Sequence, residues 1–116
     1  MTDEQEERRR AKRHELWIPV QVESGPDVQM LAVSRNISWS GALVVVGATL
    51  EVGERVDLTL TLPGEDPRKV QAEIVRVEVN EEDPDGVWRY RLGLRFDEDV
   101  EDLEPVFERM ESQAAR

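Results

Sequence analysis

The stretch that most constrains the fold is Val56–Leu62, VDLTLTL, in which apolar and polar residues alternate without interruption. Successive side chains of a β-strand point to opposite faces, so the valine and leucines share one face and the aspartate and threonines share the other. A helix would scatter the same leucines around its circumference. The chain must therefore build a sheet that buries one face against a core.

Five further segments are apolar at strand spacing, and turn residues rather than helical periods separate them. The apolar phase slips by one residue at Ile74–Val75, which predicts a β-bulge. Pro19 predicts that the first strand lies at an edge. Together the six strands predict an all-β fold, a six-stranded antiparallel meander that closes into a β-barrel and so removes its exposed edges. The five segments are Leu16–Val22, Val28–Ile37, Ala42–Val46, Val70–Val79 and Val87–Phe96, the last with Trp88 facing inward.

After the last strand the apolar period changes from two to that of a helix. Acidic residues crowd the start of this segment, where the positive end of a helix dipole favours them. Pro105 is tolerated best in a first turn, so we expect the regular helix of this C-terminal segment to begin near Asp102. The residues that share its apolar face are Val100, Leu103, Val106, Phe107 and Met110.

Composition excludes several classes of protein. The 116 residues fit one domain. The net charge of −11 argues against a general DNA-, RNA- or membrane-binding protein, because its field repels phosphate. The chain has no cysteine, which excludes disulfides, thiolate nucleophiles and zinc–thiolate sites. With no apolar run long enough for a membrane span or a secretory signal, we expect a cytoplasmic protein.

Nothing in the sequence predicts an enzyme. His14 is the one histidine, and we expect it to be exposed to solvent in the N-terminal arm, with no cysteine to pair with. Carboxylates cluster in turns and around the terminal helix, as solvated surface groups do. There is no phosphate loop, dinucleotide fingerprint or metal-ligand spacing, so we expect no cofactor and no metal.

Positive charge is concentrated in the segment EERRRAKRH, which ends at His14. Planar guanidinium groups suit phosphates and guanine edges better than ammonium groups do. A solubilising tail is the alternative reading of such a segment. The pattern divides the chain into a flexible basic arm, residues 1–14, and a barrel domain with its terminal helix, residues 15–113.

A second polar segment, NISWSGALV, begins at Asn36 between the second and third strands. Asparagine, serine and glycine together predict a sharp reversal of the chain. Ser38 and Ser40 are expected to hydrogen-bond the local backbone, and Gly41 to take a positive φ angle. An ordinary hairpin turn would account for these features too.

The order of these segments resembles the PilZ domain family. Arg-x-x-x-Arg (Arg9 and Arg13) precedes the first strand, and Asn-x-Ser-x-x-Gly (Asn36, Ser38 and Gly41) lies between the second and third strands. A strand ending RLGLRF and a terminal helix follow, so the resemblance covers nearly the whole chain. It implies a six-stranded antiparallel barrel with a C-terminal helix and, in many members, binding of the second messenger cyclic di-GMP.

The resemblance also implies roles for the arm. Arg9 and Arg13 should grip the nucleotide through guanine acceptor edges and phosphate oxygens, since both accept two-pronged arginine contacts. Arg10 is a secondary candidate for ligand binding. Arg8 and Lys12 are expected to add general positive potential.

On the barrel side, the resemblance implies that Asn36 and Ser38 hydrogen-bond the nucleotide and that Gly41 lets the backbone pass close by or turn. Asn36 stands where the family more often has aspartate, which keeps an acceptor and loses a charge. Trp39 either covers an edge of the barrel or lies against a guanine, and Trp88 is similarly open.

We therefore expect a stand-alone receptor that binds cyclic di-GMP, orders its arm, and relays the signal to an unidentified effector protein. One alternative is a PilZ-fold adaptor that needs no nucleotide and presents the acidic face Glu101–Glu111 to a partner. Another is a small barrel that binds nucleic acid through its arm, which the acidic net charge disfavours.

Overall fold

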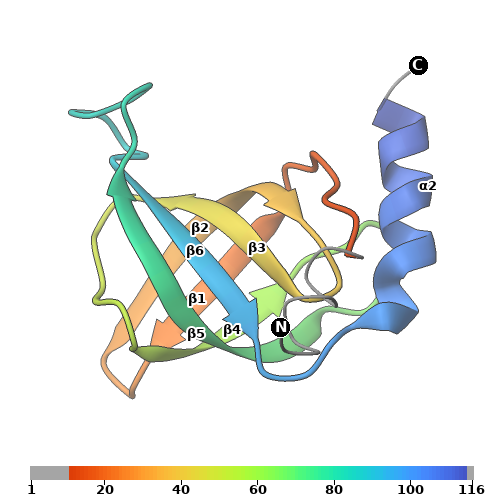
Figure 1. Ribbon diagram of the computed structural model, residues 1–116, viewed down its shortest axis with the longest axis horizontal. Helices are drawn as coiled ribbons and strands as arrows, with labels where there is room; N and C mark the ends of the chain where they lie inside the picture. Colours follow the sequence, from red (N-terminus) through yellow and green to blue (C-terminus); the bar gives the residue numbers. More distant parts are fainter. Residues whose placement is uncertain (1–10, 115–116) are drawn as a thin grey trace, which may run out of the picture.

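The computed structural model describes residues 11–114, and these form six β-strands followed by one α-helix (Figure 1). The predicted all-β, six-stranded antiparallel barrel with a C-terminal helix is confirmed. In chain order the elements are β1 (Pro19–Ser24), β2 (Val28–Ile37), β3 (Gly41–Val46), β4 (Arg55–Leu60), β5 (Arg68–Val79), β6 (Tyr90–Phe96), the 3-10 turn η1 (Glu101–Leu103) and α2 (Glu104–Ala114).

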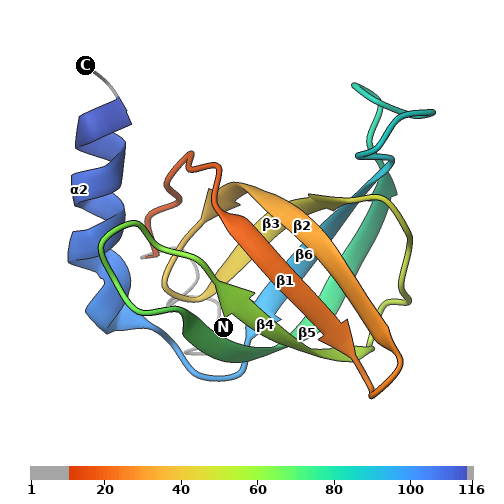
Figure 2. The ribbon, with the colours of Figure 1, turned by 180° about the vertical axis from the view of Figure 1, so that it is seen from behind.

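The strands close in the order β1-β2-β3-β6-β5-β4, and every neighbouring pair is antiparallel. The predicted meander is wrong at two places, because β3 pairs with β6 and β1 pairs with β4. Figure 2 shows β1 between β2 and β4, so the predicted edge strand is also wrong. Pro19 is tolerated because it is the first residue of β1, where a missing N–H is least costly.

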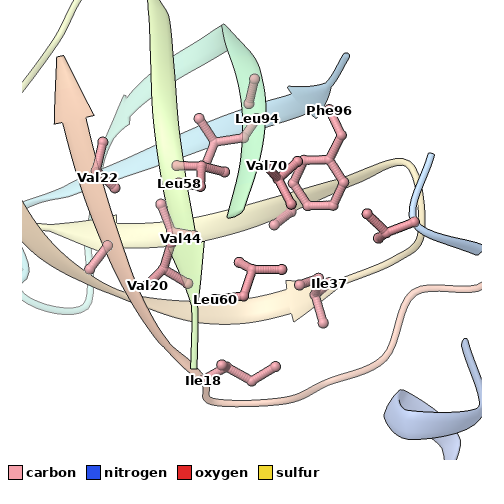
Figure 3. Packing of buried hydrophobic residues seen from close by; sticks show 14 of the residues in the cluster. Ile18, Val20, Val22, Ile37, Val44, Leu58, Leu60, Val70, Leu94 and Phe96 are labelled. Atoms are coloured by element: carbon pink, nitrogen blue, oxygen red, sulfur yellow. The ribbon is translucent and has the colours of Figure 1, made fainter. Parts of the chain in front are cut away.

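The apolar faces of the strands fill the barrel interior (Figure 3). Along β4 the predicted alternation is confirmed, since Leu58 and Leu60 are buried while Asp57 is exposed. This one-sided burial supplies the main stabilisation of the sheet. Residues labelled in the same interior include Val20, Val22, Val44, Leu94 and Phe96.

Two bulges interrupt the ladders. The register of β5 against β6 slips between Ile74 and Arg76, which confirms the predicted bulge. A second slip, between Ser34 and Asn36 in β2, was not predicted. Ser34 and Ile37 are both fully buried, so the extra residue lets Arg35 and Asn36 lie side by side on the outer surface. This bulge places two polar side chains where a regular strand would place one.

The last strand is shorter than predicted and begins at Tyr90 instead of Val87. Side chains of the preceding loop capture the backbone groups that would have extended it. Asn80 Nδ2 donates to the Trp88 carbonyl at 2.7 Å, and Asp83 Oδ2 accepts from the Trp88 N–H at 2.9 Å. Trp88 is consequently only partly buried and lies outside the core, contrary to the inward position predicted for it.

Helix α2 begins after η1, with Pro105 in its first turn as predicted. Val106 and Phe107 are buried on its inner side. Both ribbon views place α2 beside one end of the barrel and next to the segment before β1 (Figures 1 and 2). No helix within residues 11–114 is long and apolar enough to cross a membrane.

His14 is fully buried, and the prediction that it is exposed to solvent is wrong. Its Nε2 lies 2.7 Å from Glu104 Oε1 and its Nδ1 lies 3.1 Å from Glu111 Oε1, both on α2. Its ring packs against Phe107 with a centroid separation of 5.7 Å. His14 is in phase with the inward residues Leu16 and Ile18, so the local alternation extends back to it, while its partners come from the far end of the chain.

Candidate functional site

The two polar segments identified in the sequence meet at the outer surface of the barrel. Arg13 Nη1 donates a hydrogen bond of 2.8 Å to Asn36 Oδ1, across 23 residues of sequence. The backbones of His14 and Ile37 hold this approach in place through two hydrogen bonds, 2.8 and 2.9 Å long. Half of the Arg-x-x-x-Arg motif is thus brought to the first residue of the Asn-x-Ser-x-x-Gly motif. The other arginines predicted to bind the ligand, Arg9 and Arg10, lie outside the described residues.

The turn that follows Asn36 is organised by Ser38, which is almost fully buried. Its hydroxyl accepts from the Ser40 N–H at 3.2 Å and lies 3.4 Å from the Gly41 carbonyl, while its own N–H donates to that carbonyl at 2.8 Å. The predicted local role of Ser38 is confirmed. The Ser40 hydroxyl lies 3.2 Å from that of Ser38. Ser38 therefore shapes the turn on which Asn36 is presented.

The prediction that Gly41 has a positive φ angle is wrong. Among the described residues, the glycines with positive φ angles are Gly25, Gly53 and Gly64. The reason for a glycine here is instead the approach of β6. A Cβ at Gly41 would lie under 3.0 Å from the Leu94 carbonyl oxygen. The close approach that the structure shows is that of β6, and the expected role of Gly41 toward the nucleotide stays a prediction.

A cleft of about 250 Å³ opens beside Asn36 on the outer face of the barrel. It is built by the segment before β1, the bulged end of β2, the strands β3 and β6, and the loop between β5 and β6. Its lining is mostly charged, with one large aromatic side chain. The lining residues are Glu15, Trp17, Arg35, Asn36, Leu43, Glu82 and Arg91.

Ion pairs organise the mouth of this cleft. Glu82 lies between two guanidinium groups, with Oε2 3.3 Å from Arg35 Nη1 and Oε1 3.4 Å from Arg91 Nη2. Arg91 is also held by Asn80, whose Oδ1 accepts from Nε at 3.3 Å. The Arg35 guanidinium carbon lies 4.9 Å from the centre of the Trp17 ring. Glu82 thus bridges the two cleft arginines, and Glu15 is the second carboxylate of the same lining.

The tryptophan that lines this cleft, Trp17, was not predicted to be a site residue. Trp39 packs against the core, and its carbonyl accepts from Val100 N–H at 2.8 Å, which agrees with the barrel-covering alternative. Trp17 is instead 66 % exposed. A signal for it was present, because Leu16 and Ile18 face inward and the residue between them must face outward. Arg35 could not have been placed without the bulge.

A second hollow, of about 410 Å³, lies at the start of β5 and differs in charge. Burial, reinforced by the neighbouring charge of Glu101, raises the pKa of Asp99. The Arg68 guanidinium, 2.6 Å from Asp102, lowers the pKa of that carboxyl. Carboxylates dominate this lining, so it suits an anion less well than the cleft beside Asn36 does. Residues 11–114 hold no group of three histidine, cysteine, aspartate or glutamate side chains that could bind a metal.

Comparison with known proteins agrees with the fold. The model of the PilZ domain matches residues 7–110. No curated protein matches the sequence. Among solved structures, the chain is similar to the Bacillus subtilis inhibitor of motility MotI/DgrA (22 % identity, TM-score 0.63), with 91 % of this chain and 49 % of that chain covered. The chain thus spans about half the length of that protein.

Two isolated PilZ domains are similar over nearly their full lengths. One is the PilZ domain of CeSA from a cellulose-synthesizing bacterium, at 21 % identity and a TM-score of 0.59, with 90 % of this chain and 99 % of that chain covered. The other is the PilZ domain of YcgR from Escherichia coli with c-di-GMP, at 14 % identity and a TM-score of 0.64, with 94 % and 95 % covered. At these identities the likeness concerns the fold.

Proposed function

Because the chain belongs to the PilZ domain family, we propose that it is a receptor for cyclic di-GMP rather than an enzyme, and that it binds the nucleotide beside Asn36. The observation that carries the proposal is the contact between Arg13 and Asn36, which joins the two motifs. The PilZ domain of YcgR, which shares this fold, was solved with c-di-GMP.

The chemistry of the contact suits an anionic purine nucleotide. The guanidinium of Arg13 can donate two parallel hydrogen bonds to guanine O6 and N7 or to a phosphate. Its partner Asn36 is neutral, so the hydrogen bond orients the guanidinium without compensating its charge. An aspartate at this position would orient the same group and also neutralise it. Arg9 and Arg10 are proposed to complete the grip from the arm.

The Asn-x-Ser-x-x-Gly segment is proposed to form the barrel side of the site. Asn36 lies on the surface with its amide next to Arg13, where it can also meet the nucleotide. Ser38 contributes through the turn it stabilises, and its hydroxyl is the proposed contact to the ligand once the turn opens slightly. Gly41 permits the close approach of β6 at the end of this turn.

We further propose that binding orders the basic arm, residues 1–14, on the barrel domain, residues 15–113. Fixing about six residues costs on the order of 6–12 kcal/mol of backbone entropy. Charge-assisted hydrogen bonds of about 1.5–3 kcal/mol each, together with stacking on guanine, can offset that cost. The end of the arm already has a fixed point, because His14 is buried and bridged to Ile37.

The route to an effector protein is proposed to run through α2. Arg13 contacts the ligand site, while the next residue, His14, contacts Glu104 and Glu111 of the helix. A shift of Arg13 on ligand binding would therefore move the adjacent His14 and change its contacts with α2. The outer surface of α2 is the surface that an effector protein would then bind. In the adaptor alternative, the partner would bind the same surface without nucleotide.

The test is titration calorimetry with cyclic di-GMP. The wild-type protein is expected to bind, and Arg13→Ala to bind at least tenfold more weakly, because it removes a contact made to the ligand. Arg76→Ala is the matched control, since it removes an equal charge from the exposed surface of β5, outside the cleft. Equal affinities of Arg13→Ala and wild type would refute the role of the arm. Capture of a partner protein without nucleotide, combined with no binding of cyclic di-GMP, would favour the adaptor.

A further inference from the structure

Among the described residues, Trp17 is a large aromatic side chain whose exposure to solvent is not explained by a structural role. It is 66 % exposed, so its ring adds little to the core. The neighbouring residues Leu16 and Ile18 are buried and hold the backbone on both sides of it. The indole is therefore presented at the surface from a fixed piece of backbone.

The ring is also held in position by a cation. The guanidinium of Arg35 lies 4.9 Å from the ring centroid, within the range of a cation–π contact. Glu82 fixes the same guanidinium at 3.3 Å. Trp17 and Arg35 thus form an ordered pair of flat groups, and the bulge in β2 is what turns Arg35 toward the ring.

The position of this pair ties it to the ligand site. Trp17, Arg35 and Asn36 line one cleft, and Asn36 accepts the hydrogen bond from Arg13. A nucleotide held by Arg13 would therefore place one of its bases within reach of the indole. The other walls of the cleft carry Glu15 and Arg91, which suit the polar rim of a base better than an apolar side chain of a protein partner.

We propose that Trp17 and Arg35 are the platform on which a guanine base of the bound cyclic dinucleotide stacks. This inference rests on the proposed function and adds to it a binding residue outside both motifs. Bases stack on aromatic rings and on guanidinium planes, and the stacking does not require a second hydrogen-bonding edge. Arg13 and Asn36 are then left free to bind the edge of the base or the phosphate.

The test compares three variants of the full chain by titration with cyclic di-GMP. Trp17→Ala should weaken binding roughly 5- to 150-fold, the affinity equivalent of base–aromatic stacking. Trp17→Phe keeps an aromatic face and should retain most of the affinity. Leu31→Ala is the matched control, because it removes an apolar side chain that is 62 % exposed on β2 and does not line the cleft.

The outcomes separate the two proposals. Wild-type affinity in Trp17→Ala would overturn the stacking platform while leaving cyclic di-GMP binding in place. No binding by the wild-type protein would overturn both. A structural role is excluded by a second measurement, the thermal midpoint without nucleotide, which should be the same in Trp17→Ala and wild type because the ring is exposed. Nucleotide should also quench tryptophan emission in the wild type, and Trp17→Phe should lose that quenching.

Discussion

Replacing Gly41 by alanine should destabilise the barrel, although Gly41 has a φ angle that any residue can adopt. The added Cβ would lie under 3.0 Å from the carbonyl oxygen of Leu94 on β6. That oxygen belongs to the backbone of a paired strand, so no side-chain rotation can relieve the clash. Either β3 or β6 must move at the Gly41–Arg95 pair, where the two strands begin to pair.

The size of the effect follows from the contacts at this point. Overpacking a well-filled site costs about 1–3 kcal/mol. The adjacent hydrogen bond from Phe96 N–H to the Ser40 carbonyl, 2.9 Å long, would lengthen as the strands separate, at about 0.5–1.5 kcal/mol. Alanine also lowers the entropy of the unfolded chain, which returns about 0.4–1 kcal/mol. The expected net loss is about 1–4 kcal/mol, a large share of the roughly 5–15 kcal/mol that stabilises most domains.

Urea unfolding and a thermal melt would measure this loss, with an expected fall in Tm on the order of 10 °C. Gly93→Ala is the matched control within β6. Its Cβ would meet the Arg76 Cβ at 3.1 Å, so β5 need give way by only a few tenths of an ångström, and the substitution should cost well under half as much. If Gly41→Ala were as stable as Gly93→Ala, the close approach of β6 would not be the reason for this glycine. A role in contacting the ligand would then be the better explanation.

Three other perturbations have expected outcomes that follow from single contacts. His14→Ala empties a fully buried position and leaves two helix carboxylates without their partner, so urea unfolding should show a loss of about 2–4 kcal/mol. The hydrogen bond from Arg68 lowers the pKa of Asp102, so this pair stabilises the fold above the ordinary carboxyl pKa of about 4. That stabilisation is lost as the pH falls below this value. Thermal melts between pH 7 and pH 3 should therefore show a smaller loss of stability with acid in Asp102→Asn than in the wild type. Glu82→Gln frees the two cleft arginines from a competing carboxylate, and calorimetry should show binding of cyclic di-GMP about two- to fivefold tighter, whereas weaker binding would mean that Glu82 contacts the ligand.

The sequence predicted those parts of the fold that depend on local period. The alternation at Val56–Leu62 identified a strand and its buried face, and the phase slip near Ile74 identified a bulge. The change of period after β6 identified α2 and the place of Pro105 in it. Each of these signals lies within a few residues of the structure it predicts, because side-chain direction is set by the local backbone.

The features that could not be predicted depend on contacts between distant segments. The pairing of β3 with β6 is decided by closure of the whole barrel, since any two apolar strands can pair. The hydrogen-bond partners of the buried His14 are two glutamates 90 and 97 residues away. The bulge at Arg35 has no apolar signature, because the residue it adds is polar and faces outward.

For the site, the motifs predicted which segments meet, and the structure adds the geometry. The resemblance assigned Arg13 and Asn36 to one ligand site, and in the structure the two side chains contact each other. Ser38 and Gly41 contribute to the fold as well as to the predicted site. Ser38 stabilises the turn, and Gly41 permits the close approach of β6. Trp17 was overlooked because it fell in the predicted strand Leu16–Val22, where an isolated outward residue usually has no function; the observed β1 begins only at Pro19.

Local charge explains how a protein of net charge −11 can offer a site to an anion. Charges act over a Debye length of about 8 Å at physiological salt, so distant carboxylates are largely screened. Within that range Arg13 is paired with a neutral amide, so the two cleft arginines and Arg13 outnumber the two carboxylates that line the cleft, Glu15 and Glu82. A compact dianion stays inside this region, whereas a longer polyanion would extend from it over acidic surface and be repelled. On the proposed function, this arrangement would admit a small cyclic dinucleotide more readily than RNA or DNA, even though both present the same bases and phosphates.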